Sequence, residues 1–366
     1  KNSPKRDYYI WKKGKGNKEP NNWRSYFSSS AWEYDKGTGE YYLHMFSKKQ
    51  PDLNWNNYRV REEIYNIMKF WLDKGIDGFR MDAVNLFVKP RTFPDSPKTP
   101  ATLDGYVFDE DMYSNQPGIH ELLREMNEKV LSKYDIVCIG ETLNVTPETA
   151  RLYSDEVRKE LDMVCNSELM FIDAGPKWKW DVIPWKLTDF KKIIAKWQVG
   201  LFGKGWNCLY FSNHDQPRMV SRFGNDTIYR KESAKLLATL LLTIQGTPFI
   251  YQGEEIGMTN VKFSSIEDYR DVETLNFYRE AVNSGWPVEK VMEAIYCKGR
   301  DNVRTPMQWN DEKNAGFTKG EPWIKVNPNY KEINVAQSLA DPESVLNHYK
   351  KLIHIRKNLP VLTYGD

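Results

Sequence analysis

Apolar residues recur at helical spacing in several segments of the chain, and short continuous apolar runs lie between them. In residues 60–74 the apolar positions are three or four apart and Gly75 follows as a stop signal, which predicts a helix. The same spacing predicts helices over residues 119–131, 189–197, 232–244 and 345–357. The apolar runs predict strands at residues 76–82, 136–141, 161–167, 209–215 and 247–252. Alternating helices and buried strands are typical of a parallel α/β sheet, here with about five visible strands.

Two regions lack this alternation. Residues 1–51 are rich in Lys, Gly, Asn, Trp and Tyr, with a strand candidate at 40–46, and predict an irregular small domain or a long loop. Residues 258–327 form a long insertion after the last strand candidate. A long loop in this position usually shapes the active site or its lid, although the stretch around Arg300 can also be a structural turn built on Asn and Pro.

Composition and charge narrow the classes of partner. The 52 basic and 50 acidic residues are spread along the chain and give a net charge of +2, so no basic face for nucleic acid is predicted. The longest apolar stretch, residues 236–244, is far too short to span a bilayer. The 13 Trp, 21 Tyr and 16 Phe are mostly expected in the core, but a surplus beside a cleft suits the apolar faces of sugar rings.

The cysteines give a prediction about the compartment. Cys138, Cys165, Cys208 and Cys297 are widely spaced, without the pair spacing of a metal site. We therefore expect four buried free thiols, which favour a reducing cytoplasm.

Three acidic residues carry the candidate chemistry, because each closes a predicted strand. They are Asp82, Glu141 and Asp215. A parallel α/β barrel places its chemistry at the carboxyl ends of its strands, so these acids predict one shared site for glycoside cleavage. Taken singly, each could instead cap the following helix. Arg80 lies two positions before Asp82, on the same face of the strand, and His214 directly precedes Asp215, which favours the catalytic interpretation.

Several motifs resemble the α-amylase superfamily, glycoside hydrolase family 13. They are Gly78-Phe79-Arg80-Met81-Asp82-Ala83, Ile139-Gly140-Glu141, Asn213-His214-Asp215-Gln216-Pro217-Arg218 and Tyr251-Gln252-Gly253-Glu254-Glu255. Two more runs resemble the oligo-1,6-glucosidase and α-glucosidase subgroup, namely Gln50-Pro51-Asp52-Leu53-Asn54-Trp55 and Arg304-Thr305-Pro306-Met307-Gln308-Trp309. The likeness extends over nearly the whole chain.

The resemblance implies a retaining mechanism with three acidic roles. Asp82 is expected to be the nucleophile, Glu141 the general acid and then base, and Asp215 the carboxylate that stabilises the distorted sugar. A retaining pair lies about 5 to 5.5 Å apart, with one member ionised and the other protonated. Arg80 is expected to hold Asp82 ionised, and nearby carboxylates to push the pKa of Glu141 upward.

The same matching implies a glucose-binding set. His214 and Arg300 are expected to bind hydroxyls of the terminal glucose, and Phe27 and Phe46 to wall the pocket, although either Phe could be plain core. Glu273 falls where the family contacts the leaving sugar.

The residue after the nucleophile bears on linkage. Members of the subgroup that prefer α-1,6 bonds generally carry Val there and those that prefer α-1,4 bonds carry Ala, and this chain has Ala83. The physical reason is steric, and a change of this size gives only about 1 to 3 kcal/mol of discrimination. The resemblance therefore implies an exo-acting α-glucosidase that prefers α-1,4 bonds of maltose and short oligosaccharides.

The resemblance also sets the expected domain organisation. It implies a TIM (β/α)8 barrel with an inserted domain B, present here as a partial barrel of about strands 4 to 8. The N-terminal strands and the C-terminal β-sandwich are not recognisable, so the segment alone is expected neither to close a barrel nor to turn over substrate. We expect domain B at residues 1–51, the barrel part at 52–258, the insertion at 259–327, and the last helix with a linker at 328–366.

Other functions remain open. The alternatives are oligo-1,6-glucosidase, trehalose-6-phosphate hydrolase, sucrose isomerase and, outside enzymes, the heavy-chain scaffold of amino-acid transporters. Ala83 argues against the first, and the intact set of three acids argues against the scaffold. Acid, base and nucleophile suffice for the reaction, so no cofactor and no catalytic metal are required. Some relatives hold a structural Ca²⁺ in an early barrel loop, whose residues would precede Lys1.

Overall fold

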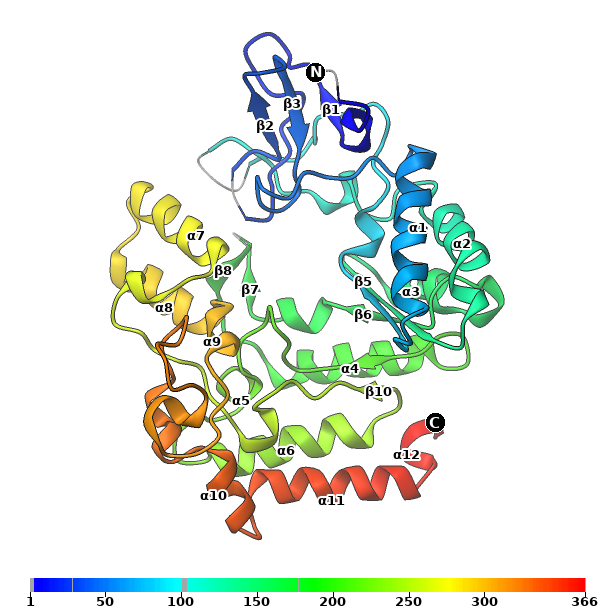
Figure 1. Cartoon of the computed structure of the whole chain (residues 1–366). Coiled ribbons are helices and arrows are strands. Elements are labelled where there is room, and N and C mark those ends of the chain that lie inside the picture. Colours follow the sequence, from blue (N-terminus) through cyan, green and yellow to red (C-terminus); the bar gives the residue numbers. More distant parts are fainter. Residues whose placement is uncertain (1–2, 28, 101–103, 177, 366) are drawn as a thin grey trace. The chain divides into compact units, whose positions relative to one another are not determined.

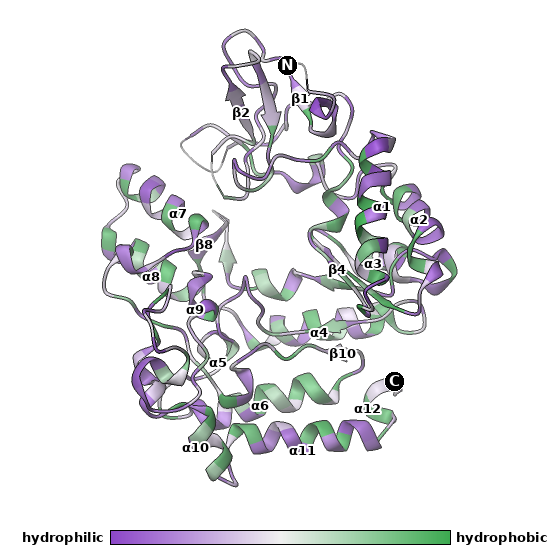
Figure 2. Cartoon of the chain, viewed as in Figure 1, coloured by the Kyte–Doolittle hydropathy of each residue, from purple (hydrophilic) through white to green (hydrophobic). Residues whose placement is uncertain are grey.

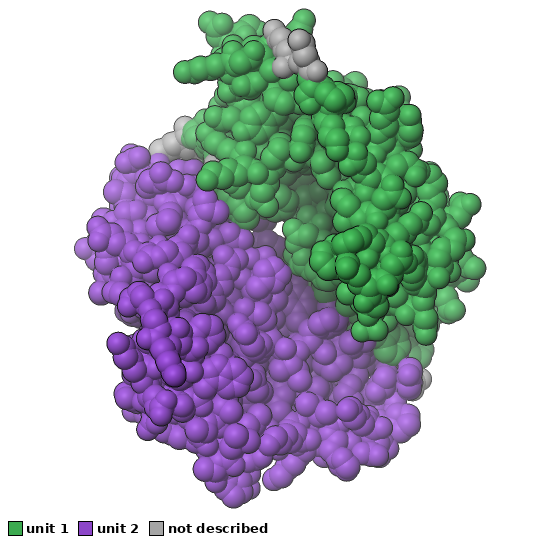
Figure 3. Space-filling view, in the orientation of Figure 1, with its two compact units in different colours: residues 1–169, 187–207 green, residues 170–186, 208–366 purple. Residues whose placement is uncertain are grey.

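Helices alternate with short strands between residues 58 and 248, and helices without strands follow in residues 272–364 (Figure 1). The computed structural model describes residues 3–27, 29–100, 104–176 and 178–365. Its contacts divide the chain into two units, coloured separately in Figure 3. Unit 1 consists of residues 1–169 and 187–207, and unit 2 of residues 170–186 and 208–366.

A parallel sheet forms the centre of unit 1. Its strands are β4 (Gly78–Met81), β5 (Val137–Thr142) and β6 (Met163–Asn166), in the order β4-β5-β6. Glycine starts β4 for a steric reason: Gly78 has φ +144°, and a Cβ there would collide with the carbonyl of Val137 on β5. The helices of this unit are α1 (Tyr58–Leu72), α2 (Ile119–Lys129), α3 (Pro147–Ser154) and α4 (Leu187–Leu201).

The apolar stripe of α1 is wider than the face that it buries. The helix begins at the N-cap Asn57, whose side chain accepts a hydrogen bond from the Arg59 amide at 3.0 Å. It buries Tyr65, Met68 and Leu72 in the core of unit 1. Ile67 and Trp71, which the periodicity also assigns to the apolar face, are about half exposed at 52% and 48%. Figure 2 shows the hydrophobic and hydrophilic residues alternating along this helix.

A small antiparallel sheet lies near the N-terminus of unit 1. Its strands are β1 (Trp11–Lys12), β2 (Trp32–Asp35) and β3 (Glu40–Leu43), with β3 in the middle. Buried residues around it, including Trp23, Trp32 and Met45, form one apolar cluster that also contains Ala83. The residue after Asp82 therefore packs in the core of the N-terminal segment.

Unit 2 is mainly helical. It has two strand pairs, the antiparallel β7 (Ala174–Gly175) with β8 (Trp178–Val182) and the parallel β9 (Cys208–Leu209) with β10 (Thr247–Pro248). Its helices are α5 (Met219–Phe223), α6 (Arg230–Thr243), α7 (Val272–Asn283), α8 (Val288–Lys298), α9 (Asp301–Arg304), α10 (Val335–Ala340), α11 (Val345–Asn358) and α12 (Val361–Tyr364). The sheets of the described residues are separate and unclosed.

The five helices predicted from periodicity are present, with ends shifted by a few residues. Strand β5 has the predicted length, and the other four predicted strands are shorter, most of all β9 and β10. Asp215 therefore lies in a loop six residues after Leu209 and does not close a strand. The sequence indicates a long loop at 258–327, and this prediction is wrong for the middle part of that segment. It contains α7, α8 and α9, and apolar residues of α7 and α8 pack with Trp180 and with one another.

The prediction of four free thiols is correct for two cysteines. Cys138 is buried and Cys297 half-buried, and both are free. Cys165 and Cys208 are disulfide-bonded, so the prediction is wrong for them. Whether a cysteine meets another thiol within bonding distance depends on tertiary structure, which sequence spacing does not reveal. No helix among the described residues is both long and apolar enough to cross a membrane.

Candidate active site

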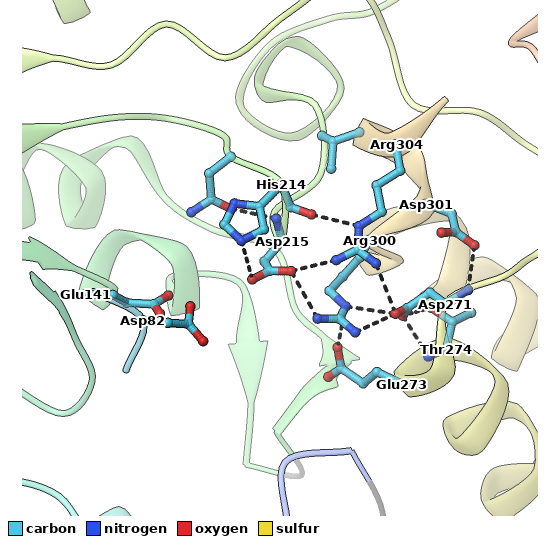
Figure 4. A network of polar contacts seen from close by, with 12 residues as sticks. Asp82, Glu141, His214, Asp215, Asp271, Glu273, Thr274, Arg300, Asp301 and Arg304 are labelled. Atoms are coloured by element: carbon cyan, nitrogen blue, oxygen red, sulfur yellow. Dashed lines mark hydrogen bonds and ion pairs between the residues drawn. The ribbon is translucent and has the colours of Figure 1, made fainter. Parts of the chain in front are cut away.

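Neighbouring strands place Asp82 and Glu141 at the same end of the unit 1 sheet. The register pairs Met81 of β4 with Gly140 of β5, so Asp82 and Glu141 come next along the two strands. Glu141 lies within β5 and Asp82 directly follows β4. Figure 4 shows both carboxyl groups beside each other.

One arginine binds both carboxyl groups. Arg80 forms an ion pair with Asp82 through Nη1, and its Nη2 lies 3.1 Å from Oε2 of Glu141. The Ala83 amide donates to the same Glu141 oxygen at 3.1 Å. Ala83 has a left-handed backbone with φ 41°, which is uncommon for a residue other than glycine.

The surroundings of Glu141 favour its protonated form. Burial raises the pKa of this carboxyl, the Arg80 charge lowers it in part, and the neighbouring Asp82 charge raises it again. The net shift is upward, as expected from the sequence, although burial contributes more than the neighbouring carboxylate. A carboxyl group whose pKa is raised keeps its proton to higher pH than an ordinary carboxyl group, as a general acid requires.

Phe27 and Phe46 belong to an aromatic cluster of unit 1. Their ring centroids are 5.4 Å apart, and Phe46 stacks on Tyr26 at 4.9 Å. The Tyr26 hydroxyl donates to the Glu110 carboxylate at 2.7 Å, and this hydrogen bond holds the Tyr26 ring in the stack. Aromatic planes held in this way can present a face to a sugar ring.

Asp215 lies in the loop between β9 and α5 of unit 2. Asn213 starts a turn there: its side chain accepts from the Asp215 amide at 2.8 Å, and its carbonyl accepts from the Gln216 amide at 3.3 Å. Oδ2 of Asp215 lies 3.2 Å from Nε2 of His214. The turn therefore presents the Asp215 carboxylate and the His214 ring together.

Two arginines bind the other oxygen of Asp215 (Figure 4). Nη1 of Arg300 and Nη2 of Arg304 donate to Oδ1 at 3.0 and 2.7 Å. Burial by itself raises the pKa of Asp215, but the hydrogen bond from His214 and the charges of both arginines outweigh it and hold that pKa well below its usual range. Asp215 is therefore ionised throughout the neutral and mildly acidic range.

A second buried carboxylate, Asp271, orients the two arginines. Its Oδ1 accepts from Nη2 of Arg300 at 2.5 Å and from Nη1 of Arg304 at 3.4 Å. Its Oδ2 caps helix α7 by accepting from the amide of Thr274 at 2.9 Å. One side chain thus joins the start of α7 to the guanidinium groups that bind Asp215.

Glu273 is bound by two cations of unit 2. Its Oε2 lies 2.6 Å from Nζ of Lys179 on β8 and 3.3 Å from Nε of Arg300. Its exposed fraction is 7%. The arrangement fixes Glu273 on the first turn of α7, next to the Asp271 cap.

Comparison with known proteins identifies the family. The profile described as "Alpha amylase, catalytic domain" matches residues 1–365. The chain belongs to the α-amylase catalytic-domain family. It is 62% identical to an oligo-1,6-glucosidase of Parageobacillus thermoglucosidasius and 58% identical to one of Bacillus cereus. In both cases the match covers 100% of this chain and 65% of the relative, so the chain spans less than two-thirds of the length of these relatives.

The fold is also found in solved members of the family. The crystal structure of Bacillus licheniformis trehalose-6-phosphate hydrolase, as a mutant in complex with PNG, matches with a TM-score of 0.92 and 47% identity. The match covers 100% of this chain and 65% of that structure. The resemblance drawn from the motifs is therefore confirmed at the level of the α-amylase family.

Three residues of the candidate site are absent from the set that the motifs predict. Arg304 follows Arg300 by four positions, and residues at this spacing share one face of a helix. This spacing could have indicated that Arg304 lies beside Arg300. Asp271 stands three positions before Thr274, which is the spacing of an ordinary helix cap. The sequence therefore did not indicate that Asp271 also binds the two arginines. Lys179 on β8 carries no signal, because 94 residues separate it from its partner Glu273. Within the described residues, no group of three or more His, Cys, Asp or Glu side chains could hold a metal ion.

Proposed function

We propose that the protein is a retaining, exo-acting α-glucosidase that releases glucose from the non-reducing ends of maltose and short oligosaccharides. The observation that carries this proposal is the carboxyl pair Asp82 and Glu141, which shares Arg80 while the pKa of Glu141 is raised. One ionised carboxylate beside one protonated carboxyl is the arrangement that a retaining glycosidase needs. The names of the relatives support the same class of reaction.

In the proposed mechanism Asp82 attacks the anomeric carbon while Glu141 protonates the leaving oxygen. The bond between sugar and leaving group breaks and an ester between glucose and Asp82 forms. Glu141, now ionised, takes a proton from water, and the oxygen of that water displaces Asp82 and releases glucose. Arg80 stabilises the carboxylate of Asp82 before attack and after release.

Asp215 is proposed to bind the distorted glucose ring as a permanent anion. His214 and Arg300, which contact it, are proposed to bind glucose hydroxyls, and Phe27 and Phe46 to wall the pocket. Glu273 is proposed to contact the leaving sugar. The ion pairs that fix Glu273 support a defined orientation for that contact.

Two observations favour different linkages. Ala83, buried behind the nucleophile with a left-handed backbone, favours the α-1,4 preference. The relatives with 62% and 58% identity are named oligo-1,6-glucosidase, which favours the α-1,6 alternative. We propose α-1,4 preference as the leading function, because a residue beside the nucleophile acts directly on the leaving-group side.

The first experiment measures glucose release from maltose and from isomaltose by the complete protein, with Asp82→Asn as the control. Faster maltose cleavage that disappears in the variant supports the leading function. If isomaltose is cleaved faster than maltose, the leading function is rejected in favour of oligo-1,6-glucosidase. Release of glucose from neither disaccharide rejects both, and trehalose 6-phosphate and sucrose are then the next substrates.

The finer fold assignments are part of the proposal. We propose that β4, β5, β6, β9 and β10 are five strands of a (β/α)8 barrel, because all of them pair in parallel. Domain B is proposed at residues 1–51, the barrel part at 52–258, the insertion at 259–327 and the last helix with its linker at 328–366. A cytoplasmic location stays a prediction, and the disulfide-bonded Cys165 and Cys208 weaken the cysteine argument for it.

A further inference from the structure

Arg218 is a fully buried cation of unit 2 that the proposed mechanism does not use. It lies three residues after Asp215, at the start of α5, and its exposed fraction is 1%. Its guanidinium donates to the backbone carbonyl of Gln252 and, at 3.3 and 3.2 Å, to those of Asn302 and Val303. Such a group is costly to bury, so these contacts need an explanation.

Two of these carbonyls belong to α9, the short helix that carries Arg304 and directly follows Arg300. Contacts also run in the opposite direction, because Nε of Arg304 donates to the carbonyl of His214 at 3.0 Å. Each of the two segments, the loop at 213–218 and residues 300–304, therefore contributes arginine side chains that bind the other segment. Arg218 binds the backbone of α9, and Arg300 and Arg304 bind Asp215.

A third segment completes the surroundings of Arg218. The Tyr251 hydroxyl donates to the same Val303 carbonyl at 3.1 Å. Gly253 has φ +91°, and a Cβ there would lie 2.8 Å from Nη1 of Arg218. Glycine at this position satisfies the turn and also leaves room for the guanidinium.

We propose that Arg218 is a positioning residue that holds α9 where Arg300 and Arg304 reach Asp215. This inference rests on the proposed glycosidase role of Asp215. Arginine suits the task because its planar group directs several N–H donors to carbonyls in different directions, whereas a lysine has one nitrogen. Lysine at position 218 can therefore keep the charge but not the three contacts.

A matched control exists in the same unit. Arg356 on α11 has an exposed fraction of 9% and donates to the backbone carbonyls of Leu242, Ile244 and Leu362 at 2.9, 2.9 and 2.8 Å. It has the same kind of partners as Arg218, but those partners lie outside the loop at 213–218 and outside α9. Arg218→Lys and Arg356→Lys should be compared in the complete protein for Tm, kcat and KM.

We expect both variants to lower Tm and only Arg218→Lys to lower kcat, by about 30-fold with little change in KM, because a small displacement in the site mainly affects the transition state. An equal loss of kcat in both variants, or a change in KM as large as the change in kcat in Arg218→Lys, would overturn the proposal.

Two further measurements keep the proposal testable. If Arg218→Lys does not fold, Tyr251→Phe removes only the second donor to Val303 and should lower kcat about 3-fold at unchanged Tm; an unchanged kcat rejects the inference. If the wild-type protein hydrolyses no α-glucoside, the proposed function fails. The crystal structure of Arg218→Lys then decides separately whether the Arg304 contact with the His214 carbonyl is lost, as proposed, or kept.

Discussion

The carboxylate clusters of the two units differ in their balance of charge. In unit 1, Asp82 and Glu141 share Arg80, and burial leaves the pKa of Glu141 raised. In unit 2, Asp215 is bound by two arginines and His214, and its pKa is lowered despite burial. Burial raises the pKa of both groups, so the charged groups in contact with each carboxyl decide the direction of its net pKa shift.

This difference teaches that the roles of the acids follow from their surroundings. A carboxyl group that retains a proton near neutral pH can act as an acid, and one that is always ionised can stabilise positive charge on a sugar. Arg80 lies on the strand that Asp82 follows, whereas the other two arginines lie in the segment at 300–304. Substitutions can therefore change the charges around one cluster without changing those around the other.

The largest effect is expected from removing the charge of Asp82, the proposed nucleophile. Asp82→Asn should lower kcat/KM at least about 10⁴-fold, because an amide lacks the negative charge with which Asp82 is proposed to attack the sugar. Asp77→Asn, the same change at an exposed position just before β4, should leave the rate unchanged. Steady-state kinetics on the preferred disaccharide test this, and comparable losses in the two variants would refute the assignment.

Removing the proton of Glu141, the proposed general acid, should have the next largest effect. Glu141→Gln is expected to lower kcat on a disaccharide about 10³-fold. Because the pKa of Glu141 is raised, activity of the wild type should fall as rising pH deprotonates this group, and that basic limb should be absent from the variant. Glu148→Gln on α3, exposed, is the control. A basic limb that persists in Glu141→Gln would assign it to another group.

Weakening the cation balance around Asp215 should have a smaller effect. Arg304→Met removes one of the two guanidinium contacts and should lower kcat/KM about 100-fold. The pKa of Asp215 should rise, because one of the charges that lower it is lost. Arg279→Met, at an exposed position of α7, should not change the rate. If Arg304→Met matches the wild type in rate, the charge comparison between the two clusters is wrong.

The smallest effect is expected beside the acid pair, at the residue whose amide binds Glu141. Ala83→Val should raise the ratio of isomaltose to maltose cleavage about 10-fold. It should also lower Tm, because a β-branched residue is strained at φ 41°. Ala83→Gly relieves that strain and should leave the ratio near the wild-type value. A ratio that does not respond to Val would remove the steric argument for linkage.

The sequence predicted the helices better than the strands. The periodicity located α1, α2, α4, α6 and α11, because an amphipathic helix of several turns repeats its pattern often enough to be read. The two-residue strands β9 and β10 depend on pairing with each other, and their apolar runs extend beyond the paired residues. Helices α7 and α8 were missed although their apolar residues recur at helical spacing, because the motif around Arg300 favoured a loop.

The order of motifs along the chain by itself determined the family, the three candidate acids and Arg80 beside Asp82, because these follow from residue types at short spacing. Only the tertiary structure decided which cations bind which acids. Asp215 meets Arg300 and Arg304 across more than eighty residues, Asp271 joins them from the cap of α7, and Arg218 binds the backbone of α9. Contacts of this kind form when distant backbone segments fold together, and burial then gives each charge its effect on a pKa.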